Sequence, residues 1–263
     1  MPKGNIKYIM KNLYIAIALI AATLTISSCK KDDKDTTPTE TTGTVELNMA
    51  HRWGMGADNF LLNMELVHPM TQDTMTFTTF KYYVSNIKFK KADGSWYVHP
   101  ESYFLVDLAS AGSEILSIPN VPTGEYTDME YTMGVDSLRN VSGAQSGALA
   151  VANNMFWSWN SGYIMVKAEG TSPNSTSGSF AFHLGGFMGS NNVVTVKTVN
   201  FAGNSLTVAS GHTSEVHFNV NPAKLWQTAS SMATNNSIMM PGATAKTMAT
   251  DFYGGIAFDH IHE

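Results

Sequence analysis

The sequence predicts an all-β protein: an antiparallel β-sandwich, Ig-like or of a related kind, with long loops and one or two short helices. Two observations support this prediction. Short runs rich in β-branched and aromatic residues recur along the chain, and several alternate with polar residues as a half-buried strand requires. Gly, Asn, Pro and Ser separate most of these runs, which is typical of turns between antiparallel strands.

The expected strands follow one another closely along the chain. The first covers residues 45–49, where apolar and polar residues alternate, and the longest covers residues 77–89 and ends at a turn formed by residues 91–94. Short helical turns are expected at residues 148–156 and 222–229. The remaining strands are expected at residues 103–108, 126–133, 163–167, 179–184, 193–201, 205–209 and 215–221.

The first 43 residues are expected to lie outside the folded domain, which we assign to residues 44–263. Residues 1–28 carry three lysines, an apolar run and small residues before Cys29, which is the pattern of a bacterial lipoprotein signal peptide. We expect cleavage before Cys29, acyl chains on this residue and a polar, disordered tether over residues 29–43. An uncleaved helical anchor is the alternative, but the apolar run is shorter than the roughly 20 residues that a bilayer needs.

The charge and cysteine content restrict the partners of the mature protein. Removal of residues 1–28 takes three of the 16 basic residues and none of the 21 acidic ones, which leaves a net charge of −8. This charge argues against binding to nucleic acid or to anionic lipid. Cys29 is the only cysteine, so a bound metal must use His, Met or oxygen ligands.

Methionine is abundant, with 16 residues in the chain. The simpler explanation is that this adaptable side chain fills the core, and the alternative is soft ligation of Cu(I). The chain has no Met-x-Met or Met-x-x-Met cluster, which favours the first explanation.

Four histidines are the candidate metal ligands. His260 and His262 are two residues apart, so in a strand they point to the same side, the side that also carries Ile256 and Phe258. The alternative is a frayed terminus with two solvated histidines. His51 continues the inward-facing phase of the first strand, where the alternative is a hydrogen-bonded histidine at the edge of the core.

His183 points away from the apolar face of its strand, and the glycines at positions 185 and 186 permit another part of the chain to approach closely. We therefore expect His51, His183, His260 and His262 to act three or four at a time as nitrogen ligands of a metal ion, and imidazole suits Cu, Zn and Ni alike. Affinity is expected to fall below about pH 6.5, because imidazole must be neutral to bind a metal. The other four histidines are expected on the surface: His217 on the solvated face of a strand, and His68, His99 and His212 in turns.

Residues 134–170 carry the pattern of a known family. The segment contains Gly-Val-Asp, then Asn, then Gly-x-Gln-x-Gly-Ala-Leu, and finally Trp-x-Trp-x-x-Gly-Tyr. Together with residues 80–87, 103–107, 121–126 and 182–185, this segment resembles the MbnP-like copper-binding family of secreted β proteins. Relatives often carry Asp-Pro where this chain has Ala150-Val151, a difference confined to one loop. The motif residues are Gly134 to Asp136, Asn140, Gly143 to Leu149 and Trp157 to Tyr163.

The resemblance implies copper binding in the periplasm or at the cell surface. It also implies a di-haem peroxidase-like partner, which in some members converts a Trp to kynurenine. We consider Trp53, Trp157 and Trp159 as the oxidised or redox-active residues, without a motif that selects one of them. Trp157, Trp159 and Tyr163 share one face of an extended segment, where core anchoring, sugar stacking and redox chemistry are the alternatives.

The sequence therefore predicts a copper-binding lipoprotein that sequesters or transfers copper and is not an enzyme. We expect a monomer, lipid-anchored to the outer membrane on its periplasmic or surface-exposed side. The alternative is a surface module that binds glycan or protein without a metal. A hydrolase is disfavoured, because the chain has neither a Gly-x-Ser-x-Gly elbow nor a His-Glu-x-x-His motif.

Overall fold

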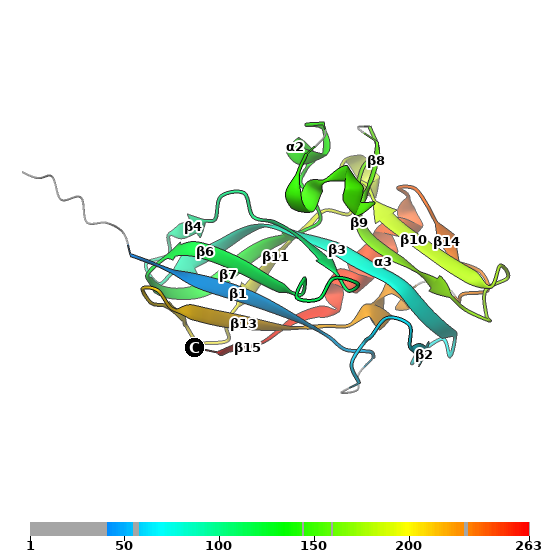
Figure 1. Cartoon of the computed structure of the whole chain (residues 1–263), viewed down its shortest axis with the longest axis horizontal. Coiled ribbons are helices and arrows are strands. Elements are labelled where there is room, and N and C mark those ends of the chain that lie inside the picture. Colours follow the sequence, from blue (N-terminus) through cyan, green and yellow to red (C-terminus); the bar gives the residue numbers. More distant parts are fainter. Residues whose placement is uncertain (1–40, 55–57, 144, 159, 229–230, 263) are drawn as a thin grey trace, which may run out of the picture. The chain divides into compact units, whose positions relative to one another are not determined.

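The computed structural model describes residues 41–54, 58–143, 145–158, 160–228 and 231–262. The predicted signal peptide, Cys29 and all but the end of the predicted tether lie outside the described residues. A compact unit spans Glu40–Glu263, and its strands form two sheets (Figure 1). In the described parts of the chain, no helix is long and apolar enough to cross a membrane.

The smaller sheet has four strands in the order β15 (Ile256–His262), β13 (Thr213–Val220), β1 (Thr42–His51) and β6 (Ile115–Pro122). The alternation predicted for β1 is confirmed, because Val45, Leu47 and Met49 are buried while the residues between them are only partly covered. β1 runs parallel to β13, and Thr44 lies opposite Thr213. The other two pairings in this sheet are antiparallel.

The larger sheet has 11 strands over the described residues. Its main path runs β11 (Thr195–Asn200), β7 (Gly124–Met133), β3 (Thr74–Lys91), β9 (Gly162–Thr171), β10 (Ser179–Gly185) and β14 (Ser237–Ile238). Five short strands pair with members of this path: β2 (Glu65–Val67), β4 (Trp96–Val98), β5 (Tyr103–Asp107), β12 (Leu206–Val208) and β8 (Phe156–Ser158).

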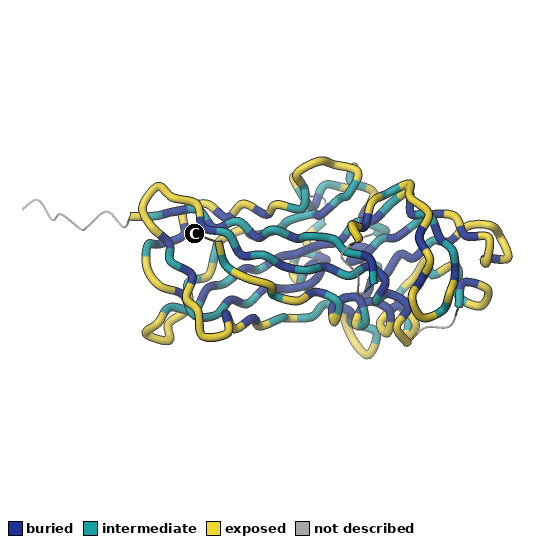
Figure 2. The backbone as a smooth tube through the Cα atoms, turned by 90° about the horizontal axis from the view of Figure 1, so that it is seen from below, coloured by how far each residue is buried: buried dark blue, intermediate teal, exposed yellow. Residues whose placement is uncertain are grey.

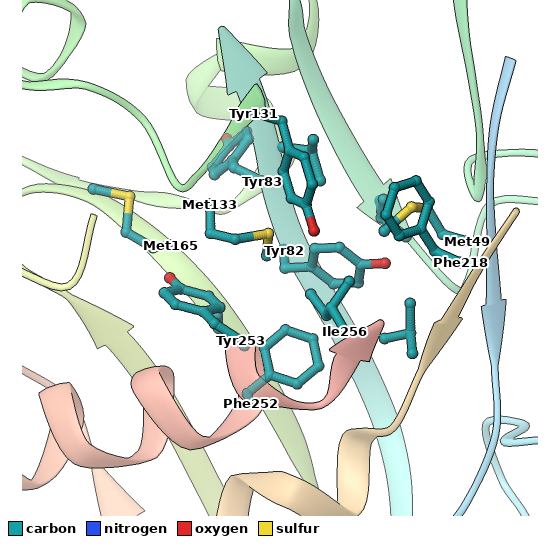
Figure 3. Close-up of a cluster of buried hydrophobic side chains, with 14 of the residues drawn as sticks. Met49, Tyr82, Tyr83, Tyr131, Met133, Met165, Phe218, Phe252, Tyr253 and Ile256 are labelled. Atoms are coloured by element: carbon teal, nitrogen blue, oxygen red, sulfur yellow. The ribbon is translucent and has the colours of Figure 1, made fainter. Parts of the chain in front are cut away.

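The long strand β3 meets different partners along its length, within one continuous hydrophobic core. Its first half pairs with β9 and its second half with β7, and the register shifts between Ser85 and Lys88. The first half packs on helical segments: the rings of Phe80 and Phe252 lie 5.4 Å apart. Beyond the shift, the large sheet packs on the small one to form the sandwich, with Tyr131 and Phe218 at 5.7 Å. Figure 3 shows buried side chains of both sheets and of α3 meeting in one cluster.

The predicted all-β sandwich is confirmed, with two parallel strand pairs, β1–β13 and β10–β14, in an otherwise antiparallel arrangement. Buried positions follow the strands while the turns are exposed (Figure 2). The expected helical turns are present as 3₁₀ helices: η1 (Gly147–Leu149), η2 (Val151–Asn153) and η4 (Pro222–Trp226); η3 (Gly189–Asn191) and the one-turn α2 (Ser137–Asn140) were not expected.

The prediction missed the helix α3 (Ala243–Gly254), which covers part of the large sheet. Its buried residues recur at intervals of three and four, as one face of an α-helix requires, so the sequence did contain a signal for it. No side chain caps its N-terminus, where Gly242 precedes the first turn, and three threonines lower its helix propensity. The buried residues are Ala245, Met248, Ala249, Phe252 and Tyr253.

Candidate metal centre

Two neighbouring strands of the small sheet bring three histidines together. β13 and β15 pair so that His217 lies opposite His260, with His262 two residues further along β15. The rings of His217 and His260 stack with centroids 4.3 Å apart and planes 8° from parallel. The ring of His262 lies edge-on to that of His217 at 6.5 Å. We refer to His217, His260 and His262 as the histidine cluster.

A β-bulge places the histidine cluster on the outer face of the sheet. The register shifts so that Phe258 pairs with Phe218 and His260 with His217, which leaves Asp259 as an extra residue. An extra residue reverses the inward and outward alternation of a strand. The prediction that His260 and His262 share the face of Ile256 and Phe258 is therefore wrong, because sequence spacing does not reveal the bulge.

Carboxylates flank two rings of the cluster. His217 Nε2 lies 2.8 Å from Glu215 Oε2, and His260 Nδ1 lies 2.9 Å from Asp259 Oδ2. The distance between His217 and Glu215 is that of an ion pair, but the angles are not those of a hydrogen bond. Within the described residues, the buried Nε2 of His217 therefore makes no hydrogen bond. A buried ring nitrogen that lies against a carboxylate without a hydrogen bond, next to two further imidazoles, is an arrangement that a metal ion would complete.

The three imidazoles are suitable ligands for copper, although in this structure their nitrogens do not point to one common position. Neutral imidazoles bind Cu, Zn and Ni, and nearby carboxylates orient them. Within the described residues, no three His, Cys, Asp or Glu side chains already converge as metal ligands. Because stacked rings direct their lone pairs side by side, one ring must turn. The side chain of His260 is 56% exposed and borders a depression of about 460 Å³ with His262, so it has room to turn.

His217 lies on the outer face of its strand, as the sequence predicts, but its side chain is only 21% exposed because His260 covers it. The sequence could not indicate this contact, since it depends on which strands pair and in which register. His217 is the functional candidate that sequence reasoning missed.

His51 lies at the end of β1 on the opposite face of the same sheet. Its Nε2 atom is 3.1 Å from the hydroxyl of Tyr82, and its ring packs edge-on against Phe80. Burial lowers the pKa of His51 to about 4, although a hydrogen bond with the backbone of Met49 partly opposes this effect. The inward orientation predicted for His51 is confirmed, and it keeps His51 away from the histidine cluster.

His183 lies in the other sheet, on β10. Its Nε2 atom is 2.6 Å from Glu169 Oε1, and the residue is 8% exposed. The close approach expected at the following glycines is confirmed: a Cβ on Gly185 would meet the Trp157 ring at 2.5 Å, and one on Gly186 would meet the carbonyl oxygen of Asn191 at 2.4 Å. The structure thus gathers His260 and His262 with His217, and it leaves His51 and His183 in separate surroundings.

The prediction that His68 is a surface residue is wrong. His68 is buried, its Nε2 bonds to the carbonyl of Ala223 at 2.8 Å, and its Nδ1 accepts the backbone N–H of Thr71 at 3.0 Å. Both ring nitrogens are therefore satisfied by the backbone, which permits burial. His212 is exposed in a turn, as predicted, and His99 is half-buried beside Tyr97.

The tryptophans considered for oxidation lie in different surroundings. Trp53 is buried, stacks on Phe60 at 5.7 Å and donates its Nε1–H to the carbonyl of Val67 at 2.8 Å. Trp157 is half-buried against Gly185. Trp159 lies outside the described residues.

The family motif of residues 134–163 has a structural role around Asn140. This buried side chain donates to the carbonyls of Val135 and Asp136 at 2.7 and 2.9 Å, and it accepts the backbone N–H of Tyr163 at 2.8 Å. The Tyr163 hydroxyl in turn donates to the carbonyl of Leu149 at 2.8 Å, and Tyr163 is fully buried. Tyr163 is therefore a core anchor, and the motif joins three loops rather than presenting metal ligands.

Fold and site together define an all-β sandwich protein with an imidazole-rich outer face on its smaller sheet. The sequence model of the family described as MbnP matches residues 42–240, most of the folded unit. The chain belongs to the MbnP family. The match ends before α3 and β15, so it covers His217 but not His260 and His262.

Among solved structures, the chain is similar to MbnP from Methylosinus trichosporium, with 15% sequence identity and a TM-score of 0.48 over 77% of this chain and 83% of that one. No curated protein matches the sequence.

Proposed function

We propose that this protein binds copper at the histidine cluster and sequesters or transfers it in the cell envelope, without catalysing a reaction. The observation that carries the proposal is the packing of three imidazoles from two neighbouring strands, in which the buried Nε2 of His217 lies against Glu215 and makes no hydrogen bond within the described residues. His260 and His262 supply the exposed ligands, and His217 supplies the fixed one.

Copper fits this donor set for two reasons. Among divalent first-row ions, Cu²⁺ binds a given nitrogen site most tightly, ahead of Zn²⁺ and Ni²⁺. Glu215 and Asp259 place negative charge beside two of the rings, which favours a bound cation. Membership of the MbnP family supports the same choice of metal.

The proposal includes the cellular setting predicted from the N-terminus. Acyl chains on Cys29 would hold the protein at the outer membrane, and a di-haem peroxidase-like protein would be its partner. Oxidation of Trp53, Trp157 or Trp159 by that partner would appear as a mass change on one tryptophan peptide after coexpression. The competing idea of a glycan-binding module is weaker, because it needs an exposed aromatic face and Tyr163 is buried.

Metal analysis of copper-loaded, desalted protein tests the proposal. The His260→Ala/His262→Ala variant should lose stoichiometric copper, and His217→Ala should lose most of it, while circular dichroism stays unchanged. His212→Ala is the matched control, because His212 is an exposed turn residue outside the cluster. Unchanged copper content in the double variant would refute the assignment, and loss of copper only in a His51 or His183 variant would move the site to that residue.

A further inference from the structure

We propose that Arg139 forms the centre of a binding site for a small carboxylate ligand, in a cavity beside the short helix α2. The cavity has a volume of about 380 Å³, which lies within the range of about 300–1,000 Å³ found for small-molecule sites. Figure 1 shows α2 at the top of the molecule and β15 at the bottom, so the cavity is separate from the histidine cluster. The lining residues are Glu101, Tyr103, Arg139 and 145–149.

Neighbouring side chains hold the guanidinium of Arg139 in place. It lies over the ring of Tyr103, 5.2 Å from the ring centre, which is the distance of a cation–π contact. The Tyr103 hydroxyl donates a hydrogen bond to Asp136, so the ring itself is fixed. Arg139 Nη1 donates to Gln145 Oε1 at 3.4 Å, and Gln145 Nε2 donates to the backbone carbonyl of Arg139 at 2.8 Å. A ligand would therefore meet a guanidinium whose position is already set, which lowers the entropic cost of binding.

The carboxylate of Glu101 uses only part of what this guanidinium offers. Both oxygens of Glu101 accept hydrogen bonds from the same nitrogen, Nη2 of Arg139. A guanidinium recognises a carboxylate most specifically through two parallel hydrogen bonds from two different nitrogens. Glu101 thus demonstrates that a carboxylate fits beside Arg139, and a ligand that approaches along two nitrogens would make the better contact.

Glu101 can be displaced at little cost. Its side chain is 74% exposed and that of Arg139 is 30% exposed, and exposed ion pairs contribute little to stability. The backbone of Glu101 has a φ of 51°, in the left-handed region that residues other than glycine seldom adopt. Asn86, which donates to Asp136 Oδ2 at 3.2 Å, lies in the same region with a φ of 52°. Backbone strain of this kind is found most often at ligand-binding and catalytic sites.

A purely structural ion pair is the alternative, in which Glu101 only holds the turn between β4 and β5 against α2. The two explanations differ in what they predict for a Glu101→Gln change. In a ligand site the Glu101 carboxylate competes with the ligand for Arg139, so removal of its charge should strengthen binding. If the pair is only structural, the same change creates no affinity for a carboxylate.

NMR titration of the ¹⁵N-labelled mature chain with N-acetylglycine, at constant ionic strength, tests the proposal. The Nε–H signal of Arg139 and the backbone amides of residues 145–149 should shift and saturate, whereas neutral N-acetylglycinamide should leave them unchanged. Glu101→Gln should lower the Kd by about three- to fivefold, the factor that corresponds to loss of a competing exposed ion pair. Arg139→Gln should abolish binding. Arg139→Lys should weaken it, because an ammonium keeps the charge but cannot form the two parallel hydrogen bonds.

Arg52→Gln is the matched control, because Arg52 is the other arginine of the chain and lies outside the cavity. Its Kd should equal that of the wild type, and circular dichroism checks the folding of every variant. Absence of saturable shifts in both the wild type and Glu101→Gln would overturn the proposal, as would equal affinity in Glu101→Gln and Arg139→Gln. Tighter binding of inorganic phosphate than of N-acetylglycine would overturn the assignment to carboxylates. None of these results depends on whether the histidine cluster binds copper.

Discussion

His51 Nε2 and the hydroxyl of Tyr82 lie 3.1 Å apart inside the protein, between the inner face of β1 and the long strand β3. This polar contact links the small sheet to the large one. Aromatic rings surround it: Phe80 packs against His51, and Phe252 packs against Tyr82. Because burial lowers the pKa of His51 to about 4, the ring is neutral at pH 7.

This pair predicts a loss of stability in mild acid. In the unfolded chain His51 takes up a proton near its ordinary pKa of 6.5, whereas in the folded protein it resists protonation until about pH 4. Stability from this group is therefore fully present above pH 6.5 and decreases as the pH falls toward 4. His51→Gln should reduce the difference in unfolding free energy between pH 7 and pH 4.5 by about 1–2 kcal/mol, since one pKa unit corresponds to about 1.4 kcal/mol and partial exposure weakens the effect.

Urea unfolding of both proteins at the two pH values measures this difference. His212→Gln serves as the control, because His212 is exposed. An identical pH dependence in wild type and His51→Gln would show that protonation of His51 is not coupled to folding.

Asn140→Ala should destabilise the protein strongly. The change removes three hydrogen bonds and leaves the buried backbone N–H of Tyr163 without its acceptor. An unsatisfied buried group costs about 1–3 kcal/mol, so we expect a loss in that range or slightly above it. Chemical denaturation checks this prediction, with Asn48→Ala on the outer face of β1 as the control. A loss no larger than that of the control would mean that the motif is not held together by Asn140.

Gly170→Ala should destabilise the centre of the large sheet. A Cβ at this position would lie 2.0 Å from the carbonyl oxygen of Thr76 and 2.7 Å from the ring of Phe180. Overpacking of this kind costs about 1–3 kcal/mol, and the backbone contact leaves little room to relax. Gly254→Ala, at the end of α3 with no atom within 4 Å, is the matched control and should be neutral or stabilising. Thermal unfolding of both variants compares them directly, and equal melting temperatures would contradict the prediction.

Cys29→Ser should release the protein from the membrane fraction. The lipid can be attached only to the cysteine, and a serine at this position offers no thiol. Cell fractionation with metabolic labelling by a fatty acid measures the effect, and Ser28→Ala is the control that keeps the cysteine. Membrane association that persists without label in the Cys29 variant would indicate a different anchor.

The alternation of apolar and polar residues was sufficient to predict most strands from the sequence. Val45, Leu47 and Met49 predicted the inner face of β1, and the run at residues 77–89 predicted most of β3, because side chains on a strand alternate whatever it pairs with. The spacing of the buried residues in α3 is also that of a helix, but three threonines and the absence of a side-chain cap made the segment look unfavourable for one.

The candidate site was less predictable, because it depends on pairing between distant segments. His217 and His260 become neighbours only through the register of β13 and β15, and the bulge at Asp259 decides which face they occupy. His68 likewise becomes buried because a distant carbonyl, that of Ala223, accepts a hydrogen bond from its Nε2–H group. No pattern within a single segment specifies such contacts.

The parallel pairing of β1 with β13 has a consequence for how the protein acquires its structure. The first strand of the domain is flanked on one side by a strand from its last quarter, with Thr44 opposite Thr213. Such remote pairings make folding slow, because a long loop must close before the contact forms. A nascent chain that stops short of β13 leaves one edge of β1 open, so the small sheet is completed only after β13 and β15 have been synthesised, more than 160 residues after β1.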